Sequence, residues 1–147
     1  MTALTRFSLL LLALLGASGA TLAQQSEMFG PYELHYSVVN TTFLAPDIAA
    51  TYGITRGKNR AILTLAVREH LADHSETRPM LLQGRTWDLI QNQDLDFLEI
   101  REGPAVYYIA DFKFINEEWR FFELTFRPEG ADQTYTFQFK HQLYTEE

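Results

Sequence analysis

The sequence predicts an all-β protein, and two observations carry this prediction. Apolar and polar residues alternate with a period of two along several segments, as they do in half-buried strands. Short clusters of turn-forming residues separate these segments at regular intervals, which favours antiparallel neighbours in two packed layers. We therefore expect a β-sandwich of about seven strands with an immunoglobulin-like arrangement. A small β-barrel is the alternative, because it also places alternate residues inward.

The first expected strand covers residues 32–38. Its apolar side chains alternate with polar ones from Tyr32 onward, and Pro31 stands before it. One short helix is expected over residues 47–52, because Asp47 is a good N-cap and Gly53 a good C-cap. No other helix is predicted.

A second strand is expected over residues 59–69, followed by a polar loop over residues 70–79 in which the apolar alternation stops. Polar or turn-forming clusters at short spacing separate the remaining segments. Five further strands are expected, over residues 80–90, 95–101, 105–115, 120–127 and 134–143.

Aromatic residues are concentrated in the last third of the chain, and most of them should be core. Neighbouring side chains on a strand face opposite sides of the sheet. Tyr107 beside Tyr108, and Phe121 beside Phe122, therefore cannot both point to the same side. The aromatic surface left over either lines a groove for an apolar ligand or peptide, or lies under a loop.

Residues 1–23 read as a signal peptide that is cleaved. Their apolar run, from Phe7 to Ala17, is about half the roughly 20 residues that a membrane-spanning helix needs. Small residues precede the expected cleavage point after Ala23. The sequence contains no cysteine that could carry a lipid. We expect a protein exported to the periplasm without a stable membrane anchor, with residues 24–147 as a single domain.

The charge argues against nucleic acid as a partner. The formal net charge is −7, and loss of Arg6 with the signal peptide leaves 11 basic and 19 acidic side chains, or 11 − 19 = −8. An acidic surface is repelled by phosphates unless it carries a concentrated basic patch. The sequence predicts neither partner identity nor oligomeric state.

The best candidate for a binding site is the basic segment of residues 56–60, where three cations stand within five residues of an otherwise acidic chain. It can bind an anion or a carboxylate, since arginine makes bidentate contacts and an asparagine adds a donor. It can equally neutralise nearby carboxylates and begin the next strand. The candidate binding residues are Arg56, Lys58, Asn59, Arg60, His35 and Asn40.

The evidence for catalysis or metal binding is weak. His70 and His74 have the spacing of zinc ligands on a helix, but Leu71 stands where the HExxH motif has its glutamate, and the segment reads as a loop. No serine lies in a GxSxG pattern. We therefore expect no catalytic residue, no metal site and no cofactor, and an enzyme is the less favoured reading.

Four segments resemble the proteobacterial domain-of-unknown-function family 4426. They cover residues 35–46, 52–54, 56–61 and 137–144. The resemblance covers the mature chain and implies a small exported protein with no assigned activity to carry over.

Taken together, these observations favour a periplasmic binding or interaction module. It would recognise a peptide, a protein or an envelope component through a sheet face, an exposed edge or the region from Asn40 to Arg60. The alternative is a small-molecule, anion or metal-binding protein, which includes an enzyme, in which the basic segment and a histidine converge on a pocket.

Overall fold

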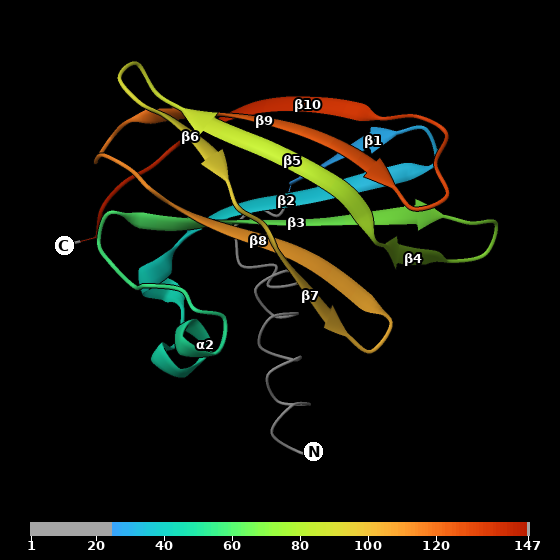
Figure 1. Cartoon of the computed structure of the whole chain (residues 1–147), viewed down its shortest axis with the longest axis horizontal. Helices are drawn as coiled ribbons and strands as arrows, with labels where there is room; N and C mark the ends of the chain where they lie inside the picture. Colours follow the sequence, from blue (N-terminus) through green and yellow to red (C-terminus); the bar gives the residue numbers. More distant parts are fainter. Residues whose placement is uncertain (1–24, 147) are drawn as a thin grey trace.

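The computed structural model describes residues 25–146 as two antiparallel sheets packed face to face (Figure 1). The predicted signal peptide, residues 1–23, lies outside the described residues. The larger sheet has the order β1-β2-β3-β8-β7, with β4 also paired to β3, and the smaller has the order β10-β9-β5-β6. The strands are β1 (Gln25–Phe29), β2 (Tyr32–Asn40), β3 (Arg60–His70), β4 (Ser75–Arg78), β5 (Met80–Trp87), β6 (Asn92–Leu95), β7 (Leu98–Glu102), β8 (Ala105–Lys113), β9 (Trp119–Pro128) and β10 (Tyr135–Gln142).

This arrangement confirms the predicted sandwich. Both sheets stay open among the described residues, so the barrel alternative was wrong. The order β2-β3-β8-β7 facing β10-β9-β5-β6 follows the immunoglobulin pattern, in which strands A, B, E and D form one sheet and G, F, C and C′ the other. The chain reaches this fold without a disulfide, since it has no cysteine.

The main core lies between the sheets and is built from alternate residues of each strand. On β3, the side chains of Leu63, Leu65 and Val67 are fully buried. They face Phe122, Leu124 and other inward residues of the smaller sheet in one continuous cluster. The alternation read from the sequence therefore identified the inner face correctly.

A second core covers part of the outer face of the larger sheet. The short helix α2 (Pro46–Thr51) and the 3-10 turn η1 (Thr41–Phe43) connect β2 to β3, and α2 packs on outward residues of β3 and β8. Tyr107 is buried there, while its neighbour Tyr108 is buried in the main core. A sheet covered on both faces thus accommodates both tyrosines.

The helix was predicted with the wrong N-cap. Its N-cap is Ala45 and its first residue is Pro46, where a missing N–H costs no hydrogen bond. Asp47 lies in the first turn instead. Gly53 has a positive φ of 67° directly after the C-cap Tyr52, which glycine adopts without a steric penalty.

Three strands of the sandwich were not predicted. β1 precedes the first expected strand, β4 lies in the expected loop 70–79, and β6 lies in an expected turn. β1 and β4 form edge pairings with β2 and β3, and the backbone supplies these hydrogen bonds whatever the side chains are. A four-residue polar strand such as β4, with the sequence SETR, leaves no apolar alternation to detect.

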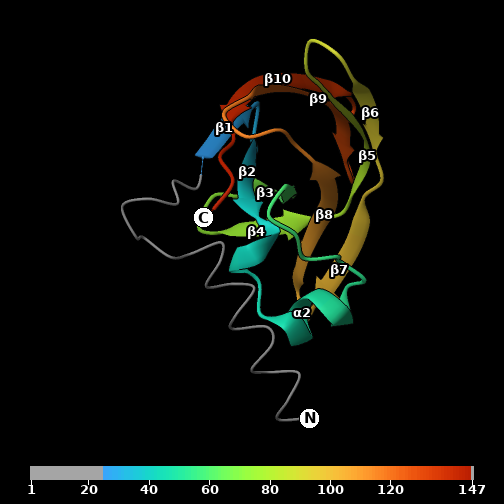
Figure 2. The ribbon, with the colours of Figure 1, turned by 90° about the vertical axis from the view of Figure 1, so that its left-hand side faces the viewer.

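Two predicted strands also have different bounds. The strand expected over residues 80–90 ends at Trp87, and that expected over 95–101 begins at Leu98. The connection between β5 and β6 projects at the top of the molecule in Figure 2. Within residues 25–146, no helix combines the length and the hydrophobicity needed to span a bilayer.

Candidate functional site

Five segments meet at one end of the sandwich, which we call the loop end: residues 41–43, 56–59, 88–91, 113–119 and 140–146. They lie along the left margin of Figure 1. Hydrogen bonds connect them across long stretches of sequence. The Asn40 side chain donates to the carbonyl of Tyr144 over 2.7 Å, Phe114 N–H donates to the carbonyl of Asn59 over 2.8 Å, and Thr145 N–H donates to Asn116 Oδ1 over 2.8 Å.

Large apolar side chains are concentrated at the loop end. Of the ten large apolar side chains exposed within residues 25–146, six lie there: Phe43, Leu89, Ile90, Ile115, Trp119 and Tyr144. Leu89 is 99% exposed and Ile90 is 82% exposed. Isolated exposed apolar residues are ordinary on protein surfaces, but a concentration of them at one end is a feature that binding surfaces share.

Leu89 and Ile90 are presented by an ordered turn between β5 and β6. Asp88 Oδ1 accepts hydrogen bonds from Ile90 N–H at 2.7 Å and Gln91 N–H at 2.6 Å, and Asp88 N–H donates to the Gln91 carbonyl over 2.9 Å. This is an aspartate turn of the kind that closes tight loops. The two apolar side chains therefore stand on a fixed backbone.

A buried arginine anchors this turn. Arg120 is 1% exposed, and its Nη1 lies 3.4 Å from Asp88 Oδ2 and 3.1 Å from Glu118 Oε1. Its Nε donates to Thr86 Oγ1 over 2.9 Å, and its guanidinium lies over the ring of Phe112. A charge that is almost wholly buried requires such partners. The network joins β5 and β9 to the base of the loop.

The two carboxylates of the network differ in their environment. Burial raises the pKa of Glu118. Burial would also raise the pKa of Asp88, but hydrogen bonds from the Gln91 and Ile90 N–H groups hold that pKa below its ordinary value. The ionised form of Asp88 is thus the form that accepts the turn's hydrogen bonds.

The loop end contains three of the six predicted binding residues, Arg56, Lys58 and Asn59, and Asn40 lies next to it. Arg56 Nη2 donates to the Thr42 carbonyl over 3.0 Å, and Lys58 and Asn59 are exposed. Asn40 contacts the C-terminal segment as described above. Arg60 forms an ion pair with Asp111 on the neighbouring strand β8. The basic segment therefore combines two roles, since Arg60 neutralises a carboxylate while Arg56 and Lys58 remain at the surface.

His35 lies apart from this group, in the middle of β2. Its Nε2 is 3.5 Å from Glu33 Oε1 and makes no hydrogen bond within residues 25–146. Glu33 instead accepts from Ser26 at 2.7 Å and contacts His70 Nε2 at 2.8 Å. Burial lowers the pKa of His35. The structure therefore brings Arg56, Lys58, Asn59 and Asn40 to one end and leaves His35 elsewhere.

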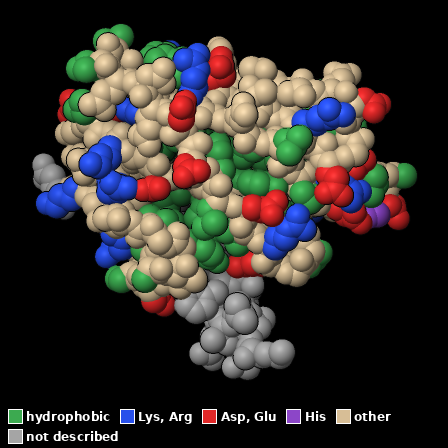
Figure 3. All heavy atoms as spheres, in the orientation of Figure 1, with side chains coloured by type: hydrophobic (Ala, Val, Ile, Leu, Met, Phe, Trp, Pro, Cys, Tyr) green, Lys and Arg blue, Asp and Glu red, His purple; other side chains and the backbone are tan. Residues whose placement is uncertain are grey.

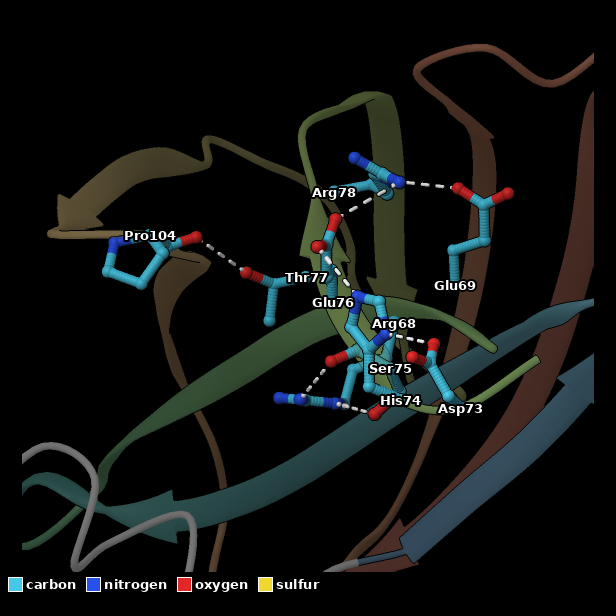
Figure 4. Close-up of polar contacts among 9 residues, drawn as sticks. All are labelled: Arg68, Glu69, Asp73, His74, Ser75, Glu76, Thr77, Arg78 and Pro104. Carbon is cyan, nitrogen blue, oxygen red and sulfur yellow. Dashed lines mark hydrogen bonds and ion pairs between the residues drawn. The ribbon is translucent and has the colours of Figure 1, made fainter. Parts of the chain in front are cut away.

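The two histidines with zinc-like spacing do not converge. Figure 4 shows His74 between two carboxylates, with Nδ1 2.5 Å from Asp73 and Nε2 2.9 Å from Glu76. His70 faces Glu33 on another strand. Among the described residues, no three histidine, cysteine, aspartate or glutamate side chains are grouped so as to hold a metal ion.

Two of the hollows on the described surface lie away from the basic segment. An open groove of about 590 Å³ lies against the ends of β5, β7 and β9, and its lining includes Leu81, Glu99 and Asp132. A smaller hollow of about 180 Å³ is lined in part by Trp87, Phe121 and Lys140. None of the six predicted binding residues lines either hollow. Phe121, part of the predicted leftover aromatic surface, stacks on Trp87.

The family follows from a comparison with family models. The model of DUF4426, a domain of unknown function, matches residues 26–146. The chain belongs to the DUF4426 family. The match spans both sheets and confirms the resemblance read from the sequence. A search of curated proteins found no match.

Solved structures support the same fold. A DUF4426 family protein from Pseudomonas aeruginosa is 25% identical, with a TM-score of 0.71; the alignment covers 84% of this chain and 97% of that one. FetP of uropathogenic Escherichia coli strain F11, which was expressed in the periplasm, is 9% identical, with a TM-score of 0.62 and coverage of 86% and 97%. A copper-bound variant of FetP is also 9% identical, with a TM-score of 0.63 and coverage of 85% and 97%. At 9% identity the FetP likeness shows the fold alone.

Leu89, Ile90 and Arg120 were missed as site residues, although the sequence carries signals for them. Leu89 and Ile90 are adjacent apolar residues, so they break the alternation expected of a strand after Trp87. Arg120 is two residues before Phe122 and four before Leu124, so all three side chains point to the same face of the strand. That face is the inner one, and it therefore receives a charge. Its carboxylate partners come from distant segments, which alternation does not reveal.

Proposed function

We propose that this DUF4426 protein is an exported, non-catalytic binding module that docks on a component of the bacterial envelope through its loop end. The observation that carries the proposal is that six of the ten large apolar side chains exposed in the described part of the chain lie at this end. Covering them with a partner would remove apolar area from water, which is the main favourable contribution to association.

The anchoring of the β5–β6 turn supports a binding role. Chain stability gains nothing from the side chains of Leu89 and Ile90, because both are almost fully exposed. The turn that carries them is nevertheless held by a buried arginine and two carboxylates. A fixed backbone lowers the entropy lost when the side chains are covered, which favours binding.

Export to the periplasm is the second part of the proposal. It is supported by the signal-peptide pattern of residues 1–23 and by the likeness to FetP, which was expressed in the periplasm. The intact mass of the protein from the periplasmic fraction of cells that express the full-length chain tests it. A mass that begins at Gln24 is expected, and a full-length mass in the cytoplasm would contradict export.

Site-specific crosslinking in cells tests the docking surface. A photo-crosslinking amino acid replaces Ile90 in one variant and Leu81 in the other. Leu81 is a matched control, because it is 75% exposed and apolar but lies at the opposite end of β5. We expect adducts with an envelope protein or lipid from position 90 that are absent from position 81. The same adducts from both positions, or none from position 90, would contradict the proposal.

A further inference from the structure

We propose that the component bound by the loop end is the surface of an anionic phospholipid bilayer. This inference rests on the proposed function and names its partner. Four features of the loop end lead to it: a projecting apolar tip, aromatic side chains beside it, exposed cations, and the spread of these groups across one end of the molecule.

The apolar tip, formed by Leu89 and Ile90, suits insertion among lipid acyl chains better than insertion into a pocket of a partner protein. Leu89 and Ile90 are adjacent and point out from a turn that carries no exposed charge between Trp87 and Gln91. Asp88, the one ionisable residue of the turn, is bound to backbone N–H groups and to Arg120. Two aliphatic side chains can therefore leave water without removing an unpaired charge from it.

Aromatic and cationic side chains accompany the tip in the way expected at a membrane interface. Trp119 is 49% exposed and Tyr144 is 54% exposed, and both residue types favour the boundary between lipid and water. The ammonium group of Lys140 lies 4.9 Å from the centre of the Trp119 ring. At the surface of an anionic bilayer the aromatic ring would face the apolar acyl chains, and the lysine ammonium would face the negatively charged headgroups.

The charge of the loop end differs from that of the whole chain. Its segments carry four exposed cations, Arg56, Lys58, Lys113 and Lys140, against two exposed carboxylates, Glu117 and Glu146. The two other carboxylates of these segments, on Asp88 and Glu118, share the buried cation of Arg120. None of the four cations forms an ion pair among the described residues. A chain with a net charge of −7 should be repelled by an anionic membrane. The local excess of cations allows this end alone to approach it.

The arrangement of these groups fits an extended surface. Hydrophobic side chains project at the upper left of Figure 3, where the β5–β6 turn lies, and cationic side chains follow the left margin below them. The apolar and cationic residues come from five separate segments. Contacts spread over a whole end of the molecule suit a planar bilayer, with affinity that combines buried apolar area and electrostatic attraction.

Binding to vesicles tests the inference with the purified mature protein. Co-sedimentation and tryptophan emission are measured with vesicles of phosphatidylcholine alone and of phosphatidylcholine mixed with phosphatidylglycerol. We expect binding to the mixed vesicles, a blue shift of tryptophan emission, and weaker binding at high salt. Failure to bind mixed vesicles, or equal binding to both vesicle types, would overturn the inference.

Two pairs of variants assign the binding to the loop end. The double substitution Leu89→Ser and Ile90→Ser should weaken binding at least about tenfold, whereas Leu81→Ser should not. The double substitution Lys58→Ala and Lys113→Ala should also weaken binding about tenfold or more at low salt. The charge-matched control is Arg101→Ala with Arg127→Ala, on the strands β7 and β9 away from this end. Equal losses in test and control variants would overturn the inference.

The vesicle and crosslinking experiments together distinguish failure of the bilayer inference from failure of the proposed docking surface. If position 90 forms adducts only with an envelope protein and the pure protein ignores vesicles, the bilayer is wrong while the docking surface stands. If neither experiment detects an interaction of the loop end, both proposals are wrong. A lipid adduct from position 90 together with vesicle binding supports both.

Discussion

At the scale of single residues, Tyr108 joins the two sheets through its hydroxyl group. The hydroxyl donates to Glu99 Oε1 over 2.6 Å and accepts from Met80 N–H over 2.9 Å. Burial, followed by the contact with Glu99, raises its pKa to about 12. Tyr108→Phe should lower the free energy of unfolding by about 1–3 kcal/mol, because a buried N–H loses its acceptor. Urea denaturation measures this, with Tyr144→Phe as an exposed control; equal effects would contradict the assigned role.

His141 provides a residue-scale prediction of pH dependence. Burial lowers its pKa below the ordinary value of 6.5. Below pH 6.5 the unfolded chain binds a proton that the folded chain does not, so the free energy of unfolding should fall as the pH decreases from 6.5 toward the folded pKa. Denaturation at pH 7 and pH 5 should show a smaller loss for His141→Gln than for the wild type.

His74 serves as a control for this prediction, because its effect on the pH dependence of stability should have the opposite sign. Hydrogen bonds to Asp73 and Glu76 raise its pKa, so its contribution to stability is present below pH 6.5 and is lost as the pH rises through the folded pKa. His74→Gln should therefore make the loss of stability on acidification larger. A smaller loss in His74→Gln would contradict the assignment.

At the scale of elements, the β5–β6 hairpin depends on a residue of another strand. Arg120 on β9 contacts Asp88 at the turn and Glu118 before β9. Arg120→Ala would leave two carboxylates in a site where they are 8% and 12% exposed, and should cost about 3–5 kcal/mol of unfolding free energy. Arg127→Ala, on the same strand but exposed, should cost less than about 1 kcal/mol. Comparable losses for both variants would show that the buried network does not stabilise the hairpin.

Element prediction from the sequence succeeded where burial on one face produces alternation. β2, β3, β8, β9 and β10 were all anticipated, because each packs one face against the main core. The edge strands β1 and β4 were missed, because main-chain hydrogen bonds rather than side-chain burial define them. The turn at Asp88 was merged into a strand, since Leu89 and Ile90 are apolar residues and were counted with that strand although they face solvent.

At the scale of the whole molecule, the sandwich should unfold as one cooperative unit. Both tryptophans, Trp87 and Trp119, lie on the smaller sheet, so their fluorescence reports that sheet alone. The continuous inter-sheet core predicts that fluorescence and far-ultraviolet circular dichroism give the same urea midpoint. A fluorescence transition that precedes the circular dichroism transition would show that the smaller sheet unfolds independently.

The sequence also predicted part of the candidate site. The basic segment stood out by composition, and Arg56, Lys58 and Asn59 do lie at the loop end. The apolar side chains that accompany these residues come from distant parts of the chain: two connections, at Leu89 and Ile115, and the segment after β10, at Tyr144. Exposure depends on what packs over a residue, and the amino-acid pattern of a loop does not contain that information.

The sequence by itself determined the all-β class, the family and the inward face of the main strands; it favoured an immunoglobulin-like sandwich, and the open sheets of the structure decided against the barrel. These follow from local patterns, because a period of two and the turn residues between strands act within a few positions of the chain. Only the tertiary structure decided that Arg120 is buried beneath the β5–β6 turn, that His35 lies far from the basic segment, and that apolar and cationic side chains meet at one end. Those relations join residues up to 104 positions apart, as between Asn40 and Tyr144, and they arise only when the two sheets pack.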